Sequence, residues 1–336
     1  MELQQRREVS RRQMLASAMG FAAGFSPAVQ WLMAQESPST PLAADAPTTA
    51  PATAPAPRAN KRFKVAGDDL FLNNRRQNIQ AFTIAKKAGL DGVSVDMGSM
   101  KRLPDGSREF TNKLRDPQVR QQFLEASRST GVEIASLAFF AMYAWVFPDL
   151  PKPVEMAEEW VDTLVKMNVK VGMMPLMAKD GTLAEPEHAG VWKRTVEIFR
   201  KVAPQAEKAG VILGVESNLD GQGYRRFLDE VGSPNVQAYY NPGRALEFKY
   251  DAYKDIRELG KDRICALHLE QGSVPPETFE RRLGDGLIDF RRLREALLEI
   301  GWGGWMSIAR SRLKGTTSAE TNMSANAAFV REVFPE

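Results

Sequence analysis

From residue 61 onward, short apolar segments alternate with longer segments in which apolar residues recur at helical spacing. Runs of roughly four to eight apolar residues between Gly, Asp or Asn are typical of buried strands, and a period near 3.6 is typical of amphipathic helices. We therefore predict eight strands, each followed by a helix. The short segments, rich in Val and Ile, cover residues 62–67, 92–98, 132–140, 169–177, 211–217, 235–241, 264–270 and 305–311.

Helix boundaries are marked by capping residues. Asp116 followed by Pro117 is typical of a helix start, and Gly89 and Gly131 are typical of helix ends. Pro204 is expected to end or kink the helix that contains it, because proline removes a backbone donor. The predicted helices cover residues 75–89, 116–131, 154–168, 191–210, 224–232, 252–260, 289–301 and 318–334.

Strict alternation of strand and helix predicts an α/β protein with a parallel sheet, and eight units favour a closed (β/α)₈ TIM barrel. An open doubly wound sheet is the alternative, and it is disfavoured because no G-x-G-x-x-G turn follows the first predicted strand. The barrel is assigned to residues 61–336, close to the roughly 250 residues typical of this fold. Its active site is expected at the carboxyl ends of the strands.

The first 60 residues have a different composition. Arg11 and Arg12 precede a weakly apolar, Ala- and Gly-rich run, so residues 1–34 are interpreted as a twin-arginine-type signal peptide. An amphipathic helix or an uncleaved anchor is the alternative, which Pro27 disfavours as a stable membrane span. Residues 35–60 are rich in Pro, Ala and Thr and are predicted to form a disordered linker. We expect an exported, periplasmic or extracytoplasmic protein whose mature form has no transmembrane domain.

Charge and cysteine content exclude two further classes. The 45 basic residues nearly balance the 42 acidic ones, and no basic block is long enough to indicate a nucleic-acid partner. A single cysteine, Cys265, excludes an intramolecular disulfide.

Polar residues at the ends of the predicted strands are the candidates for chemistry. The early strands end at Asp68, Asp69 and Asp96, whereas the eighth strand ends without a carboxylate. The later strands end at Glu216, Asn241, His268 and Glu270. If the barrel forms, the side chains at 216, 241 and 268 are expected to meet around a common point.

Four segments carry a family resemblance: "GVILGVESN", "VQAYYNPGRA", "ICALHLEQG" and "RLGDGLIDFRRLREALLEIGWGGWMSIAR". They resemble the second half of the xylose isomerase-like TIM barrels, a superfamily of sugar isomerases, epimerases, dehydratases and endonuclease IV-type repair enzymes. The resemblance implies a divalent metal, Mn²⁺, Mg²⁺ or Zn²⁺, held by Glu, Asp, His and Glu from successive strand ends. It also implies a carbohydrate or polyol substrate whose carbonyl the metal polarises while the glutamates move a proton at carbon.

Carried over position by position, the resemblance is partial. Glu216 and His268 match the first glutamate and the histidine, and they are the predicted catalytic residues. Asn241 stands in place of the aspartate, and Ala309 in place of the final glutamate. The predicted metal site, Glu216, Asn241 and His268, is therefore degenerate. Glu270 is a substitute ligand in this scheme, because it points to the same face of its strand as His268.

Four further residues are candidates for substrate binding: Asp96, Trp145, His188 and Arg310. Each has a plain alternative. Asp96 also suits a structural cap, Trp145 local packing, His188 an exposed loop, and Arg310 an ion pair with Glu216 that replaces the charge of a missing metal.

These observations leave two functions open. The first is an exported sugar isomerase or epimerase with a degenerate metal site. The second is a non-catalytic sugar-binding barrel that has kept the pocket and lost the ion. A DNA repair nuclease is disfavoured, because two histidines cannot supply its richer metal site.

Overall fold

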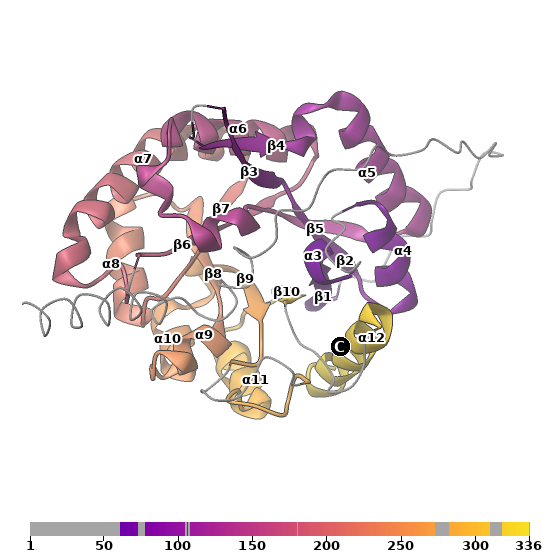
Figure 1. Cartoon of the computed structure of the whole chain (residues 1–336). Helices are drawn as coiled ribbons and strands as arrows, with labels where there is room; N and C mark the ends of the chain where they lie inside the picture. Colours follow the sequence, from indigo (N-terminus) through magenta and orange to yellow (C-terminus); the bar gives the residue numbers. More distant parts are fainter. Residues whose placement is uncertain are drawn as a thin grey trace, which may run out of the picture.

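The computed structural model describes residues 61–72, 78–104, 106, 108–179, 181–272, 282–309 and 318–335. Eight parallel strands form a closed ring in the order β1-β10-β9-β8-β7-β6-β5-β2, and the helices surround it (Figure 1). The predicted (β/α)₈ barrel is confirmed, and the open-sheet alternative is wrong. The predicted signal peptide and linker lie outside the described residues and stay predictions.

The barrel strands begin and end close to the predicted apolar segments. They are β1 (Phe63–Asp68), β2 (Gly92–Asp96), β5 (Glu133–Ala138), β6 (Val171–Leu176), β7 (Ile212–Ser217), β8 (Val236–Tyr240), β9 (Ile264–Leu269) and β10 (Gly304–Ile308).

The described α-helices are α3 (Asp69–Leu72), α4 (Gln80–Lys87), α5 (Pro117–Thr130), α6 (Pro153–Lys166), α7 (Ala189–Ala209), α8 (Gly221–Val231), α9 (Pro242–Glu247), α10 (Ala252–Leu259), α11 (Phe290–Glu299) and α12 (Ala319–Val333). The capping signals act as expected in α5. The Asp116 side chain accepts a hydrogen bond from the Gln118 backbone N–H, and Gly131 ends the helix with a left-handed φ of 69°.

Strand register places the residues of interest at one end of the ring. In the parallel pairs, Ser307 of β10 lies opposite His268 of β9, and Pro175 of β6 lies opposite Glu216 of β7. β1 pairs with both β10 and β2, which closes the barrel. The carboxyl ends of the first and last barrel strands are therefore neighbours.

Two features differ from the sequence-based expectation. The helix α7 continues through Pro204 to Ala209, because Val202, Ala203 and Ala206 around the proline are buried against the barrel, and this packing outweighs one lost backbone hydrogen bond. A two-stranded antiparallel sheet, β3 (Gly98–Arg102) with β4 (Arg108–Asn112), follows β2 where no element was predicted.

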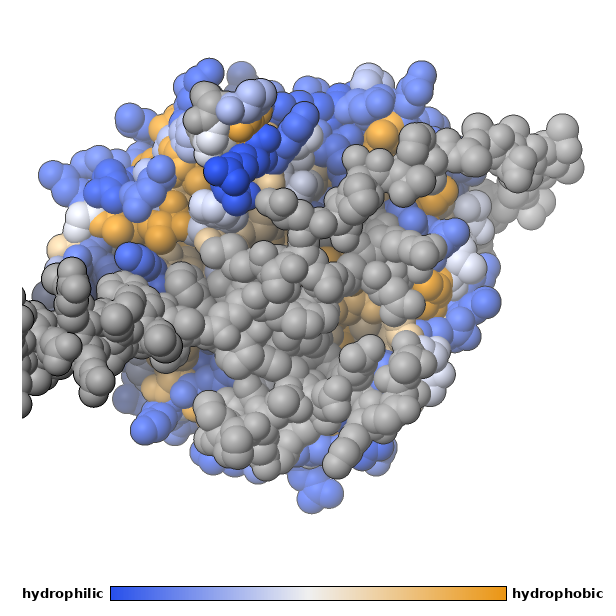
Figure 2. Space-filling model, in the orientation of Figure 1, coloured by the Kyte–Doolittle hydropathy of each residue, from blue (hydrophilic) through white to orange (hydrophobic). Residues whose placement is uncertain are grey.

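Figure 2 shows hydrophilic residues around the described rim of the molecule, with separate hydrophobic patches between them. Within the described ranges, no helix is long and apolar enough to cross a membrane.

Candidate functional site

The carboxyl ends of β1, β7, β8 and β9 bring together a buried cluster of charged side chains. Glu216 lies on β7, Asn241 follows β8, His268 lies on β9, and Asp68 ends β1. All four are at most 3% exposed. The side chains predicted to meet at 216, 241 and 268 are thus adjacent, and Asp68 joins them.

The imidazole of His268 is held between two carboxylates. Its Nδ1 lies 2.6 Å from Oε2 of Glu216, and its Nε2 lies 2.9 Å from Oδ2 of Asp68. Burial by itself favours the neutral ring, but the two negative charges outweigh burial and raise the pKa of His268 well above 6.5. The ring is therefore an imidazolium that donates one N–H to each carboxylate.

Asp68 is fixed from inside the barrel. The Ser307 hydroxyl donates a 2.8 Å hydrogen bond to Oδ1 of Asp68, and the Ser307 oxygen lies 2.9 Å from the Ser94 hydroxyl. Ser94 in turn lies 2.8 Å from Ser136. This chain of buried hydroxyls links three strands of the barrel to the carboxylate, and it leaves the other oxygen of Asp68 to His268.

Asn241 presents its amino group to the cluster. As the N-cap of α9, its Oδ1 accepts a 3.0 Å hydrogen bond from the Arg244 backbone N–H. Its Nδ2 consequently points the other way and donates to Oε1 of Glu216 at 3.0 Å and to Oε1 of Glu270 at 3.1 Å. The residue acts here as a donor between two carboxylates.

The Arg244 side chain supplies a second cation. Its Nη2 donates to Oε1 of Glu270 at 3.2 Å, and its Nε lies 3.6 Å from Oε1 of Glu216. The guanidinium carbon lies 5.6 Å from the centre of the Tyr143 ring, and the Tyr143 hydroxyl lies 3.1 Å from Nδ1 of His268. Arg244 is 4% exposed, and its Nε has no hydrogen-bond acceptor.

Glu216 is ionised in this setting. Burial by itself raises the pKa of a carboxyl group, but the charge and hydrogen bond of His268, together with the charge of Arg244, outweigh burial and lower the pKa of Glu216. The cluster therefore combines an ionised carboxylate and a protonated imidazole at neutral pH. Such a pair, with pKa values pushed apart, is the usual setting for acid–base chemistry.

Comparison with known proteins assigns the family. The model of the xylose isomerase-like TIM barrel matches residues 82–333. The chain belongs to this family. Its match therefore spans the whole helical half of the first β/α unit through to the last helix.

Among curated proteins, this family member is similar to 2-epi-5-epi-valiolone 7-phosphate 2-epimerase of Actinoplanes sp., with 25% identity over 221 residues, which cover 65% of this chain and 76% of that relative. Among solved structures, it is similar to D-allulose 3-epimerase from Methylomonas sp. (TM-score 0.62, 17% identity, 81% of this chain and 98% of the other). It is also similar to 3-keto-D-glucoside 4-epimerase from E. coli (TM-score 0.62, 16% identity, 80% and 99%). These structural likenesses show a shared fold.

The side chains of this xylose isomerase-like barrel do not fit the divalent metal that the family resemblance implies. Each expected ligand already has a hydrogen-bond partner: both oxygens of Glu216 accept N–H groups, Asn241 turns its amino group inward, and both nitrogens of His268 face carboxylates. Ala309 offers no ligand atom. Over the described part of the chain, no group of three or more His, Cys, Asp or Glu side chains is arranged to hold a metal ion.

Glu270 points toward Asn241 and Arg244, so the structure places it in the cluster. Asp96 belongs to a neighbouring group instead. Its Oδ1 accepts a 3.1 Å hydrogen bond from the Phe140 backbone, and its own N–H donates to the buried Asp69, which pairs with Lys113 at 3.4 Å. Burial, opposed by Lys113 and reinforced by the charge of Asp69, raises the pKa of Asp96 to about 8.

The remaining predicted substrate residues are not brought to the cluster by any described contact. Trp145 is half-buried, and the Arg108 guanidinium lies 4.9 Å from its ring. His188 lies in the loop after β6, with its Nε2 3.8 Å from Glu185. Arg310 lies outside the described residues. A substrate role for these residues and for Asp96 stays a prediction.

Sequence reasoning missed Arg244 and Tyr143 and left Asp68 without a role. Arg244 is visible in "NPGRA", three residues after the strand-end Asn241, where a short helix turns its side chain back over the ring. Tyr143 lies in a short 3₁₀ helix after β5 (η2, Phe140–Ala144), for which the pattern of apolar residues contains no signal.

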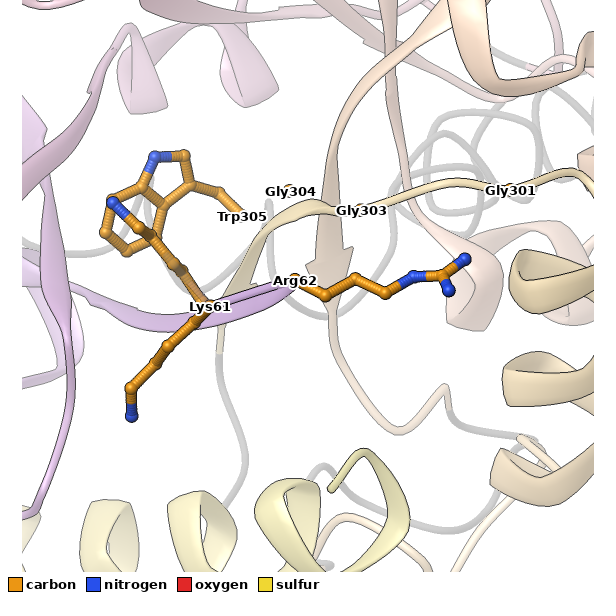
Figure 3. A pocket seen from close by; sticks show the side chains of 7 residues that line it. Lys61, Arg62, Gly301, Gly303, Gly304 and Trp305 are labelled. Atoms are coloured by element: carbon orange, nitrogen blue, oxygen red, sulfur yellow. The ribbon is translucent and has the colours of Figure 1, made fainter. Parts of the chain in front are cut away.

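The described surface also has a hollow of about 410 Å³ at the other end of the barrel, where β1 and β10 begin. Figure 3 shows Lys61, Arg62 and Trp305 around it, with Arg62 extending away from the indole ring. Its cations have local partners: Lys64 pairs with Glu133 at 3.0 Å, and Arg62 donates to the Trp302 carbonyl at 3.0 Å. The hollow therefore lies apart from the charged cluster.

Proposed function

We propose that this protein is an exported sugar isomerase or epimerase that moves a proton at the carbon next to a carbonyl group in a carbohydrate or polyol derivative. The family membership and the names of its relatives support the substrate class. The listed functions of those relatives are epimerisations of D-allulose, of a 3-keto-D-glucoside and of a cyclitol phosphate. In each case the name describes that protein, and it reaches this chain only through the proposal.

The observation that carries the proposal is the short contact between Glu216 and His268. The two groups are buried at the carboxyl ends of neighbouring barrel strands, 2.6 Å apart, one ionised and the other protonated. Barrel enzymes place their catalytic groups at this end of the strands. A base and an acid in adjacent positions are what a proton transfer at carbon requires.

The proposed step is balanced as follows. Glu216 takes the proton from carbon, and the C–H electron pair forms the double bond of an enediolate while the carbonyl oxygen becomes negative. Arg244 donates its unpartnered Nε–H to that oxygen. Return of a proton to the opposite face gives the epimer, and return to the neighbouring carbon gives the isomer. If His268 supplies that proton, the hydrogen bond to Glu216 restores the starting state.

Solvent exchange tests the step directly. The purified protein is incubated in D₂O with D-allulose, D-tagatose, D-fructose and a 3-keto-glucoside, and deuterium at the carbon next to the carbonyl is measured by mass spectrometry. We expect exchange with at least one sugar, reduced about 100-fold or more in Glu216→Gln and His268→Gln. Lys193→Ala, on the exposed outside of α7, is the matched folded control. Exchange that survives both site substitutions contradicts the proposal.

A second candidate function, non-catalytic sugar binding, is favoured by one observation. The family position of the second carboxylate holds Ala309, and the charges that remain satisfy one another. Calorimetric binding of a sugar by the wild-type protein, with no deuterium exchange, would establish this alternative.

Export rests on residues 1–34 and is tested separately. Arg11→Lys together with Arg12→Lys should retain the chain in the cytoplasm if the twin-arginine pathway carries it. Unchanged fractionation of that variant contradicts the proposal on localisation and leaves the enzymatic one untouched.

A further inference from the structure

We propose that the guanidinium of Arg244 occupies the place of the divalent cation in this barrel, so that the site works with an arginine where related sites are expected to use a metal. The inference concerns how the cluster is neutralised. It therefore holds whether the protein turns a sugar over or only binds one.

The position of Arg244 supports this assignment. Its guanidinium lies between Glu216 and Glu270, within 3.6 Å of the first and 3.2 Å of the second. Both carboxylates are buried, with exposures of 0% and 7%. Carboxylates removed from water need a compensating charge, and the planar fork of arginine is well suited to contact two of them at once.

The substitutions at 241 and 309 agree with an arginine and disagree with a metal. Nδ2 of Asn241 donates to both Glu216 and Glu270. An aspartate there would set a third carboxylate against these two, which a divalent ion can neutralise but a single guanidinium cannot. Ala309 removes another carboxylate from the same end of the barrel. Loss of two negative groups thus accompanies replacement of a doubly charged ion by a singly charged side chain.

The histidine completes this arrangement. A metal ligand must offer a lone pair, so a ligating imidazole is neutral at one nitrogen. His268 instead faces a carboxylate at each nitrogen, at 2.6 Å and 2.9 Å, and both nitrogens are donors. It contributes a positive charge to the cluster, and Arg244 contributes the other.

The test compares wild type, Arg244→Met and Arg244→Lys after dialysis against EDTA, with and without 1 mM-range MnCl₂ (about 100-fold above an expected micromolar Kd). Methionine keeps much of the side-chain volume and removes the charge, whereas lysine keeps the charge. We expect Mn²⁺ to leave the melting temperatures of wild type and Arg244→Lys unchanged. It should raise that of Arg244→Met by roughly 5 °C, because the ion fills the space between two uncompensated carboxylates.

Metal analysis gives an independent readout. After gel filtration, Arg244→Met is expected to retain Mn²⁺ near one ion per chain, and wild type only traces. Adding Glu216→Gln to Arg244→Met should abolish retention. If Arg244→Met fails to fold without metal, refolding is expected to require Mn²⁺.

The proposal is overturned if wild type binds Mn²⁺ stoichiometrically, or if Mn²⁺ neither stabilises nor refolds Arg244→Met. These outcomes are separate from the test of the proposed function, because neither metal retention nor melting depends on turnover of a sugar.

Discussion

Nε2 of His268 lies 2.9 Å from Oδ2 of Asp68, although the two residues are 200 positions apart in the chain. The contact spans β10, because β1 and β9 are separated by that strand in the ring. Asp68 reaches His268 beside Ala309, where the family resemblance would place a glutamate. A carboxylate from the first strand therefore serves the histidine at the point where the eighth barrel strand lacks one.

The first prediction concerns the protonation of His268. In the wild-type protein its imidazole should stay doubly protonated through pH 8, because Glu216 and Asp68 raise its pKa. In Glu216→Gln the titration should move down by about one unit or more. The measurement is the pH dependence of the imidazole ¹⁵N shifts, which is simple to assign because the chain has two histidines. A wild-type midpoint near the ordinary value for histidine would contradict the two-carboxylate arrangement.

The second prediction concerns Asp68→Asn. A folded-state pKa that is raised stabilises the fold fully below the unfolded-state value near 6.5 and loses this effect as the pH rises through the folded-state value. The variant should lower the free energy of unfolding by about 1–3 kcal/mol at pH 6, and the deficit should narrow toward pH 9. Urea unfolding across this range measures both.

Ser307→Ala is the control for Asp68→Asn. It removes the neutral hydrogen bond to Asp68 and leaves the carboxylate beside His268. We expect a loss of about 1 kcal/mol that does not change with pH. Parallel pH profiles for the two variants would show that the charge of Asp68 does not act through His268.

The third prediction concerns Asp96, whose pKa burial raises to about 8. Between about pH 4 and pH 8 the folded protein holds a proton that the unfolded chain has released, so stability should fall with rising pH by up to about 1.4 kcal/mol per unit. Asp96→Asn should flatten this slope, because its Oδ1 can still accept from the Phe140 backbone. An unchanged slope in urea unfolding would mean that another group, such as Asp69, holds the proton.

The fourth prediction tests the barrel packing with two glycines. In Gly172→Ala the new Cβ overlaps the ring of Trp160, which is fully buried, so we expect a loss of about 1–3 kcal/mol in the free energy of unfolding. Gly190→Ala, at an exposed position in the first turn of α7, should gain about 0.5 kcal/mol. Chemical unfolding of both variants checks the contrast, and equal effects would contradict it.

Much of the fold could be predicted because its signals are local. Each apolar run became a strand within a few residues, and Asp116 and Gly131 bound α5 as capping rules require. The β3–β4 hairpin escaped prediction because its residues are polar and mostly not buried, so periodicity carries little information there. Pro204 misled because the cost of one missing hydrogen bond is local, while the packing that offsets it is not.

The candidate site was predictable only as positions along the strands. The ends of the strands identify Glu216, Asn241, His268 and Asp68, since parallel strands in a barrel share one rim. Their partners depend on side-chain direction. The inward amino group of Asn241 follows from its cap on α9, and the reach of Arg244 follows from the turn of that helix. Neither is encoded in residue type or spacing alone.

Closure of the ring between β1 and β10 has a consequence for how the protein is made. The histidine and its first-strand carboxylate can meet only after the last barrel strand has left the ribosome and docked beside the first. Until then, each unfinished copy carries its acids and bases apart, exposed to water and chemically ordinary. The completed circle is what switches the chemistry on.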